Sequence, residues 1–261
     1  LPKDCDIYPA ELHTGSDSHL TRIRAIVPPT TPHIWKPLSD AHNVRINKHV
    51  YALDRIHTWA QLAAHISLES LAILGDAILT AIARKPGLAN GRTADGIYQD
   101  FVRQVTELPK FNAKSKCMIA LAFITPRVDS PMESKTRIAT TKYGLPPAVT
   151  NYTVPGATFS NGAPITLDLA WPEFRVAIEY DGDHHRTDKN QWRRDNDKRE
   201  LLRHHHWIVI IATAANMADE PSQAELAYRV GRQLALRGAV FDFTLTATPL
   251  DELARRRRRR I

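Results

Sequence analysis

The sequence predicts an α/β protein with a mixed central sheet flanked by helices in its C-terminal half and a smaller, mostly helical α+β domain before it. Apolar residues alternate with polar ones from about residue 165, which is typical of strands, and recur every three or four residues elsewhere, which is typical of helices. A chain of 261 residues also fits two domains. We place the N-terminal domain at residues 1–128, the C-terminal domain at 129–245 and a basic tail at 246–261.

The composition excludes several classes of protein. With 43% hydrophobic and 24% charged residues, the chain has the make-up of an ordinary soluble globular protein. No apolar run approaches the roughly 18 residues of a membrane helix, and no signal peptide is visible, so we expect a cytoplasmic protein without a membrane partner. Cys5 and Cys117 lie far apart and in no motif, which excludes a disulfide framework and a cysteine-based zinc site. The sequence leaves the oligomeric state open.

Short strands are predicted near the N-terminus. Residues 19–27 and 43–53 are rich in β-branched side chains and partly alternate between apolar and polar. The stretch 28–37 between them is rich in proline, which cannot donate to a strand ladder, so it is predicted to be a loop.

Four helices follow in the N-terminal domain. The first two are predicted over residues 58–66 and 67–85, with Thr58 and Ser67 as their N-caps. The third has one apolar stripe, and the fourth covers residues 112–124. The stripe consists of Ile97, Phe101 and Val105.

The C-terminal domain is predicted to begin with a helix that has agreeing start signals. Ser130 suits the N-cap, Pro131 the first helical position and Glu133 the third position of a capping box. The helix should end near Tyr143, because Gly144 follows it.

Two strands with a period of two come next. Residues 165–171 and 176–181 alternate, and the second strand is followed by a helix at 190–203, a strand at 207–213 and a helix at 223–237. The alternation predicts that four apolar side chains are buried on one face of the strand pair. They are Leu167, Leu169, Val176 and Ile178.

Three carboxylates lie on this strand pair. Alternation places Glu179 and Asp181 on one face, and Asp168 joins them if a two-residue turn pairs it with Glu179 or with Ala177. Clustered carboxylates repel one another unless a cation lies among them, and hard oxygen ligands suit Mg²⁺ or Mn²⁺. The alternative is the solvated polar face that most half-exposed strand pairs have.

These residues also carry a resemblance to a known family. Residues 165–202 read ITLDLAWPEFRVAIEYDGDHHRTDKNQWRRDNDKRELL, and the likeness extends from SPMESKTR through GLPPAV to LALRG. The segment resembles the nuclease-like domain of bacterial proteins related to very-short-patch-repair endonucleases, in the PD-(D/E)xK superfamily. The resemblance implies a restriction-endonuclease-like fold for the C-terminal domain. HTWAQLA and ILGDAIL upstream loosely resemble abortive-infection antitoxin-like proteins.

The resemblance implies a set of site residues. Asp168 and Glu179 correspond to metal ligands, and Glu133 on the first helix lines the same site. Asp181 and His185 match the family's D-G-x-x-H element, in which Asp181 completes the metal shell and the histidine acts as an acid–base or metal-shell residue. The lysine of the family's ExK pattern is absent, and Asp181 stands in its place; the very-short-patch branch lacks that lysine too.

Some of these residues have simpler interpretations. Glu133 is explained as a capping-box glutamate, or as a partner of Arg137 four residues on. Arg199 corresponds to a family residue that faces the site, which implies contact with nucleic acid, but it also lies four residues after Asp195 and can stabilise its own helix.

The chain ends in a run of arginines. Lys and Arg number 35 against 28 Asp and Glu, a net charge of +7, and the run supplies most of that excess. It is either a solvated, disordered tail or a phosphate-binding arm that adds salt-sensitive affinity for DNA. The run consists of Arg255, Arg256, Arg257, Arg258, Arg259 and Arg260.

Together these observations predict a metal-dependent DNA endonuclease, a hydrolase of phosphodiester bonds that uses Mg²⁺ or Mn²⁺. One alternative is a non-catalytic DNA-binding or antitoxin-like regulatory protein that retains the nuclease fold. Another is a protein-interaction module in which the carboxylates are ordinary surface.

Overall fold

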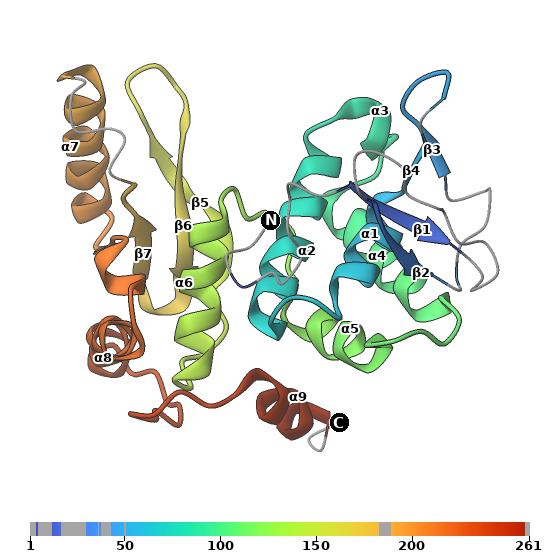
Figure 1. Ribbon diagram of the computed structural model, residues 1–261. Helices are drawn as coiled ribbons and strands as arrows, with labels where there is room; N and C mark the ends of the chain where they lie inside the picture. The colour runs from blue at the N-terminus through green and yellow to red at the C-terminus, as the bar shows by residue number, and fades with distance from the viewer. Residues whose placement is uncertain are drawn as a thin grey trace. The chain divides into compact units, whose positions relative to one another are not determined.

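The computed structural model describes residues 4, 12–16, 30–35, 37, 43–49, 51–182 and 189–258. Within these ranges the side chains of 12–16, 30–34, 189–195 and 257–258 are not described. The chain forms two compact units, Leu1–Ile124 and Thr125–Ile261 (Figure 1). The second contains a mixed four-stranded sheet with helices, so the predicted α/β class is confirmed. The predicted strand at 19–27 lies outside the described residues.

The first unit combines two small sheets with helices. Strands β1 (Leu12–Ser16) and β2 (Thr30–Ile34) pair in parallel, and β3 (Asn43–Arg45) pairs with β4 (Tyr51–Leu53) in antiparallel fashion. The helices are α1 (Arg55–Leu62), α2 (Leu68–Ala83), α3 (Pro86–Ala89), α4 (Ala94–Glu107) and α5 (Lys114–Ala120), followed by the 3-10 turn η2 (Leu121–Phe123). The loop expected at 28–37 is therefore wrong for the part that forms β2. A two-stranded sheet consists of edge strands, where proline is tolerated.

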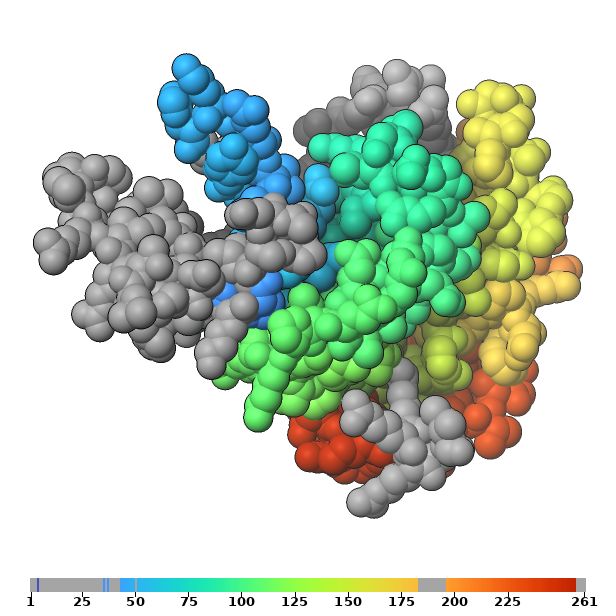
Figure 2. Space-filling model, turned by 90° about the vertical axis from the view of Figure 1, so that its right-hand side faces the viewer, coloured from blue at the N-terminus to red at the C-terminus, as the bar shows by residue number. Residues whose placement is uncertain are grey.

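The predicted strand at 43–53 is a hairpin. Its two strands are three residues each, and the segment between them turns at Asn47, whose side chain accepts a hydrogen bond from His49 N at 2.9 Å. Figure 2 shows this hairpin, in blue, standing out from the helices of the first unit. Val44, Ile46 and Tyr51 are accordingly exposed.

The helices of the first unit pack around a common core. Asp54 rather than Thr58 caps α1, because its carboxylate accepts from His57 N at 2.8 Å, whereas Ser67 caps α2 as predicted. The apolar stripe expected on α4 is buried, and its Phe101 meets Trp59 of α1 with ring centroids 5.0 Å apart. Helical periodicity therefore identified the core-facing residues of α4 correctly.

The second unit is built on the sheet β5-β6-β7-β8. Strands β5 (Val149–Thr158), β6 (Pro164–Trp171) and β7 (Val176–Tyr180) are antiparallel neighbours, and β8 (Ile208–Ala212) pairs with β7 in parallel. The helices are α6 (Pro131–Lys142), α7 (Lys189–His204), α8 (Glu220–Leu236) and α9 (Leu250–Arg258), with the 3-10 turns η3 (Pro172–Phe174) and η5 (Ala215–Met217). The sequence did not predict β5, because Pro155, Gly156 and a register shift interrupt its alternation.

Both faces of this sheet are covered by apolar clusters. Consecutive residues along the strands belong to different clusters: Leu169 and Ile178 pack with side chains of α6 and α8, whereas Ala170 and Ala177 pack with Leu202 of α7. All four apolar residues predicted to be buried on the hairpin are buried, although one of them, Leu167, belongs to the cluster beneath α7. The strand pair is therefore a central part of the unit.

The chain after α8 returns to the end of α6. Thr244 N donates to Tyr143 O at 3.1 Å, and Thr248 N donates to Lys142 O at 2.8 Å. Helix α9 follows, with Leu250 and Ala254 buried. Within the basic tail expected at 246–261, residues 250–258 therefore form a helix with buried apolar residues, and the last three residues lie outside the described chain. No helix of the described residues is long and apolar enough to cross a membrane.

Candidate active site

The strands β6 and β7 diverge where the carboxylates lie. Their antiparallel pairing runs from Trp171–Val176 to Leu169–Ile178 and stops there, although both strands continue. Extending the register by one residue sets Asp168 opposite Glu179. Beyond this point the backbone N–H of Tyr180 donates to the Oδ2 atom of Asp168 at 2.8 Å. The side chain of Asp168 therefore accepts the Tyr180 N–H, which would have bonded to a backbone carbonyl of β6 if the strand pairing had continued.

The turn of this hairpin differs from the expected one. Two residues were predicted, but four connect the paired ends, and three of them form the 3-10 turn η3. Arg175 closes the turn in a left-handed conformation, with φ 49°. The longer turn still pairs Asp168 with an odd-numbered residue, which keeps the two carboxylates on one face.

A lysine pairs with one of the strand carboxylates and acts electrostatically on the other. Lys198 of α7 donates to Glu179 Oε1 at 2.5 Å, and both side chains are about one-fifth exposed. The positive charge of the same ammonium group also opposes the rise that burial causes in the pKa of Asp168. Lys198 was not singled out from the sequence, because α7 is so rich in charged residues that nothing marks the one that turns towards the sheet.

Glu133 combines hydrogen bonds at the start of α6 with a buried carboxylate that interacts electrostatically with Asp168. Its own N–H donates to Oγ of the N-cap Ser130 at 3.2 Å, and its Oε2 atom accepts from Asp129 N at 3.0 Å, one residue before the position that a standard capping box uses. It is 8% exposed, and its pKa is raised by burial and by the negative charge of Asp168. The cap therefore holds a carboxylate within electrostatic reach of the strand acids.

Burial dominates the electrostatics of this cluster. It raises the pKa of Asp168 above the ordinary value; the Tyr180 N–H and Lys198 oppose that shift, while Asp129 adds to it. Asp129 also adds to the raised pKa of Glu133. Asp129 is thus a fourth acid of the site, and it stands at the first residue of the predicted C-terminal domain. We refer to Asp129, Glu133, Asp168 and Glu179 as the carboxylate cluster.

For the other predicted site residues, the structure gives no contact with the carboxylate cluster in the part of the chain that it describes. Asp181 lies just beyond β7, exposed, with its N–H donating to Ala212 O at 2.8 Å. Arg199 is exposed on α7 next to Lys198. His185 lies outside the described residues, as does the side chain of Asp195. This backbone hydrogen bond of Asp181 joins the end of β7 to β8.

The donor set suits a divalent cation in its chemistry. Carboxylate oxygens are the ligands that Mg²⁺ and Mn²⁺ prefer, and the pKa values of Glu133 and Asp168 are raised first by burial and then by neighbouring acids, a repulsion that a bound cation would relieve. The described side chains contain no group of three or more His, Cys, Asp or Glu arranged to hold a metal ion. Three acids of the carboxylate cluster instead accept from protein donors: Asp168 from Tyr180 N–H, Glu179 from Lys198 and Glu133 from Asp129 N–H.

The raised pKa of Asp168 has a consequence for stability. Between its ordinary pKa and the raised one the folded state binds more protons than the unfolded state, so this group's contribution to stability falls as pH rises through that window. Asp168→Asn keeps an acceptor for Tyr180 N–H but does not ionise. We expect the variant to melt above the wild type near about pH 7, with a difference that shrinks towards about pH 4. Melting temperatures of both proteins without metal, measured across this range, check the prediction; a constant difference would contradict it.

Comparison with known proteins gives relatives but no family. No family model matches the chain, and no solved structure matches it. It is 29% identical over 114 residues to the uncharacterized proteins MT2308 (strain CDC 1551 / Oshkosh) and Rv2248 (strain H37Rv) of Mycobacterium tuberculosis. The match covers 44% of this chain and 40% of each relative, so it spans less than half of either protein.

Proposed function

We propose that this protein hydrolyses DNA phosphodiester bonds in a metal-dependent reaction, on a restriction-endonuclease-like fold in the second unit. The observation that carries the proposal is the pair Asp168 and Glu179, set opposite each other where β6 and β7 separate. Glu133 supplies a third acid that interacts electrostatically with Asp168, and Lys198 supplies a cation that pairs with Glu179. Opposed acids on diverging strands, with a nearby lysine, suit a substrate that carries phosphate.

Each residue has a role in the proposed reaction. Asp168 and Glu179 would hold Mg²⁺ or Mn²⁺, with Asp181 completing the shell. A metal held by these residues would supply a water of lowered pKa and would neutralise charge on the phosphate. Lys198 orients Glu179 and, once a cation shares that carboxylate, can turn its ammonium towards the phosphate.

The remaining residues support this arrangement. The hydrogen bonds of Glu133 at the start of α6 hold its carboxylate in place, so it would contribute negative charge to the metal site from a fixed position. His185 would exchange a proton with the water or the leaving group. Arg199, exposed one residue after Lys198, would meet the DNA backbone.

A plasmid assay tests the proposed activity. Supercoiled DNA is incubated with the protein and Mg²⁺, Mn²⁺ or Ca²⁺, and with EDTA as the metal-free control. We expect nicked or linear DNA with Mg²⁺ or Mn²⁺ and none with EDTA. Absence of cleavage under every condition, on single-stranded as well as duplex DNA, would overturn the proposal.

A second candidate is a DNA-binding protein without turnover. The observation that favours it is the ion pair between Lys198 and Glu179, which already neutralises one of the two acids. A half-buried pair of this kind can serve the fold alone. DNA binding that is independent of divalent metal, without cleavage, would support this candidate.

The arginine run gives a separate prediction. Arg255 and Arg256 pair with Asp251 and Glu252 on α9 at 2.9 and 2.7 Å, but all four side chains are substantially exposed, so these pairs are weak. Replacing Arg255–Arg260 with glutamine should weaken DNA binding and flatten its salt dependence by about one unit of slope for each phosphate that the protein no longer neutralises. Binding titrations at several salt concentrations check this, and an unchanged slope would show that the run does not bind DNA.

A further inference from the structure

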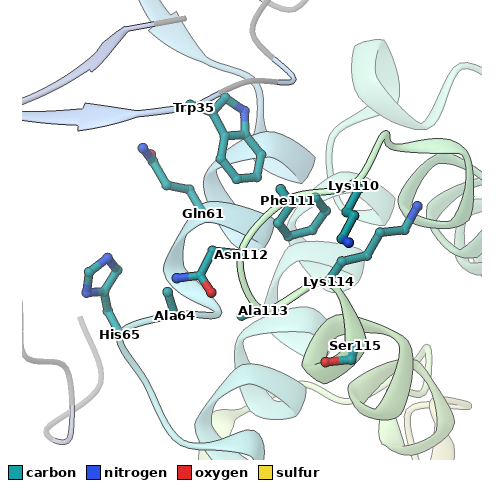
Figure 3. A pocket seen from close by; sticks show the side chains of 10 residues that line it. All are labelled: Trp35, Gln61, Ala64, His65, Lys110, Phe111, Asn112, Ala113, Lys114 and Ser115. Carbon is teal, nitrogen blue, oxygen red and sulfur yellow. The ribbon is translucent and has the colours of Figure 1, made fainter. Parts of the chain in front are cut away.

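A pocket of about 920 Å³ lies in the first unit, away from the carboxylate cluster along the chain. Its walls come from α1, from the loop that leads into α5, and from Trp35 after β2 (Figure 3). The volume is within the usual range for small-molecule sites. The residues that carry the argument are Trp35, Gln61, Lys110, Phe111, Asn112 and Lys114.

The pocket contains a supported aromatic ring. Trp35 is 4% exposed and packs against Phe111 with ring centroids 4.9 Å apart at an interplanar angle of 59°. Phe111 itself is only half-buried. A ring that is held on one side and accessible on the other is a platform on which a flat ligand can stack.

Two amide side chains lie on one side of this ring. In the view of Figure 3, Gln61 of α1 and Asn112 lie to one side of Phe111. Neither side chain forms a hydrogen bond with another residue in the described part of the chain. An amide offers donors and an acceptor together, which is the combination that the edge of a nucleobase also presents.

Two lysines lie on the other side of the ring in the same view. Lys114 donates to the carbonyls of Thr106, at 3.0 Å, and Leu108, so it holds the loop to the end of α4. Lys110 is exposed and has no ion pair with any residue that the structure describes. Lys110 is therefore the cation that can meet an anionic ligand.

We propose that this pocket binds one nucleotide. The base stacks on Phe111, its edge faces Gln61 and Asn112, and its phosphate meets Lys110. The same chemistry is available in a free mononucleotide and in a terminal nucleotide of a DNA strand that carries a 5′-phosphate. The proposal is independent of the proposed nuclease activity, because none of its residues belongs to the carboxylate cluster.

The test is a calorimetric titration of the full chain in EDTA, where no metal-dependent cleavage occurs. The probes are the four deoxynucleoside monophosphates, deoxyadenosine, inorganic phosphate, and a short single strand with and without a 5′-phosphate. We expect a monophosphate or the phosphorylated strand to bind more tightly than the nucleoside or phosphate alone. Binding of the strand but not of the monophosphates identifies the strand end as the source.

Variants connect binding to the pocket. Phe111→Leu should weaken binding at least about fivefold, because base stacking is removed while the core stays apolar. Lys110→Gln, an exposed change that does not threaten the fold, should abolish the advantage of nucleotide over nucleoside. Lys85→Gln, at an exposed lysine of the same unit outside the pocket, is the matched control and should leave binding unchanged.

Three results would overturn the proposal. The first is that neither monophosphates nor the phosphorylated strand bind. The second is that inorganic phosphate binds as tightly as they do, which would indicate an anion site without base recognition. The third is binding that Lys110→Gln leaves as it was. Because the melting temperature of each variant is measured alongside, loss of folding is not mistaken for loss of the site.

Discussion

Asp168→Asn and Glu179→Gln are each expected to reduce DNA cleavage by about a hundredfold or more. Removing a group that only orients a metal ligand typically lowers metal affinity or activity roughly 10- to 100-fold. These two acids are proposed as the ligands themselves, so the loss should be at least as large. Cleavage rates of supercoiled plasmid in Mg²⁺ and in Mn²⁺ measure the effect. Glu173→Gln is the control: this exposed carboxylate lies in the turn of the same hairpin and should leave the rate unchanged.

Stability separates these two variants. Asp168→Asn removes a carboxylate whose charge is costly where it lies, so its melting temperature should be equal to or above that of the wild type. Glu179→Gln removes the partner of Lys198 and should cost about 1 kcal/mol. The sequence alone would have predicted relief of repulsion in both cases, because it did not reveal the lysine. Full activity in either variant would show that the proposed ligands are not part of the reaction.

Gly144→Ala is expected to destabilise the second unit by about 2–4 kcal/mol. Gly144 follows α6 with φ 84°, and a Cβ placed there would come within 2.0 Å of the carbonyl oxygen of Asp242. That oxygen is backbone, so relief requires the segment after α8 to move away from the helix. The left-handed conformation alone contributes roughly 1–2 kcal/mol, and the clash adds the rest. Denaturant unfolding of both proteins measures the difference.

Gly162→Ala is the matched control for that experiment. Gly162 has nearly the same φ, 80°, but a Cβ there meets nothing within 4 Å. The substitution should therefore cost only the conformational part, about 1–2 kcal/mol. Equal losses at the two positions would show that the contact between Asp242 and the end of α6 contributes little.

The sequence predicted local structure well where the signal was local. The N-cap Ser130, the proline after it and the glycine beyond Tyr143 bound α6 as expected, because each acts on its own backbone. Alternation identified β6 and β7 for the same reason. Strand β5 was not predicted, because Pro155, Gly156 and a register shift interrupt its period of two.

The candidate site was predictable only in part. Asp168 and Glu179 could be placed on one face, because the parity of strand pairing decides this without coordinates. Lys198 and Asp129 could not be assigned, since they come from a helix and a loop that only tertiary packing brings to the strands. The same holds for the pocket beside Phe111, whose walls come from segments that are well separated along the chain.

The return of the chain to the end of α6 affects the order in which the two units can fold during synthesis. Thr244 and Thr248 bond to carbonyls about a hundred residues earlier, and Phe241 and Phe243 pack against the cluster under α8. Contacts so distant in sequence form late, since the intervening chain must first be brought together. During synthesis the first unit can fold as soon as it emerges from the ribosome. The second has to wait for almost its last residues, and nascent chains that stop before residue 239 should expose apolar surface to chaperones and proteases.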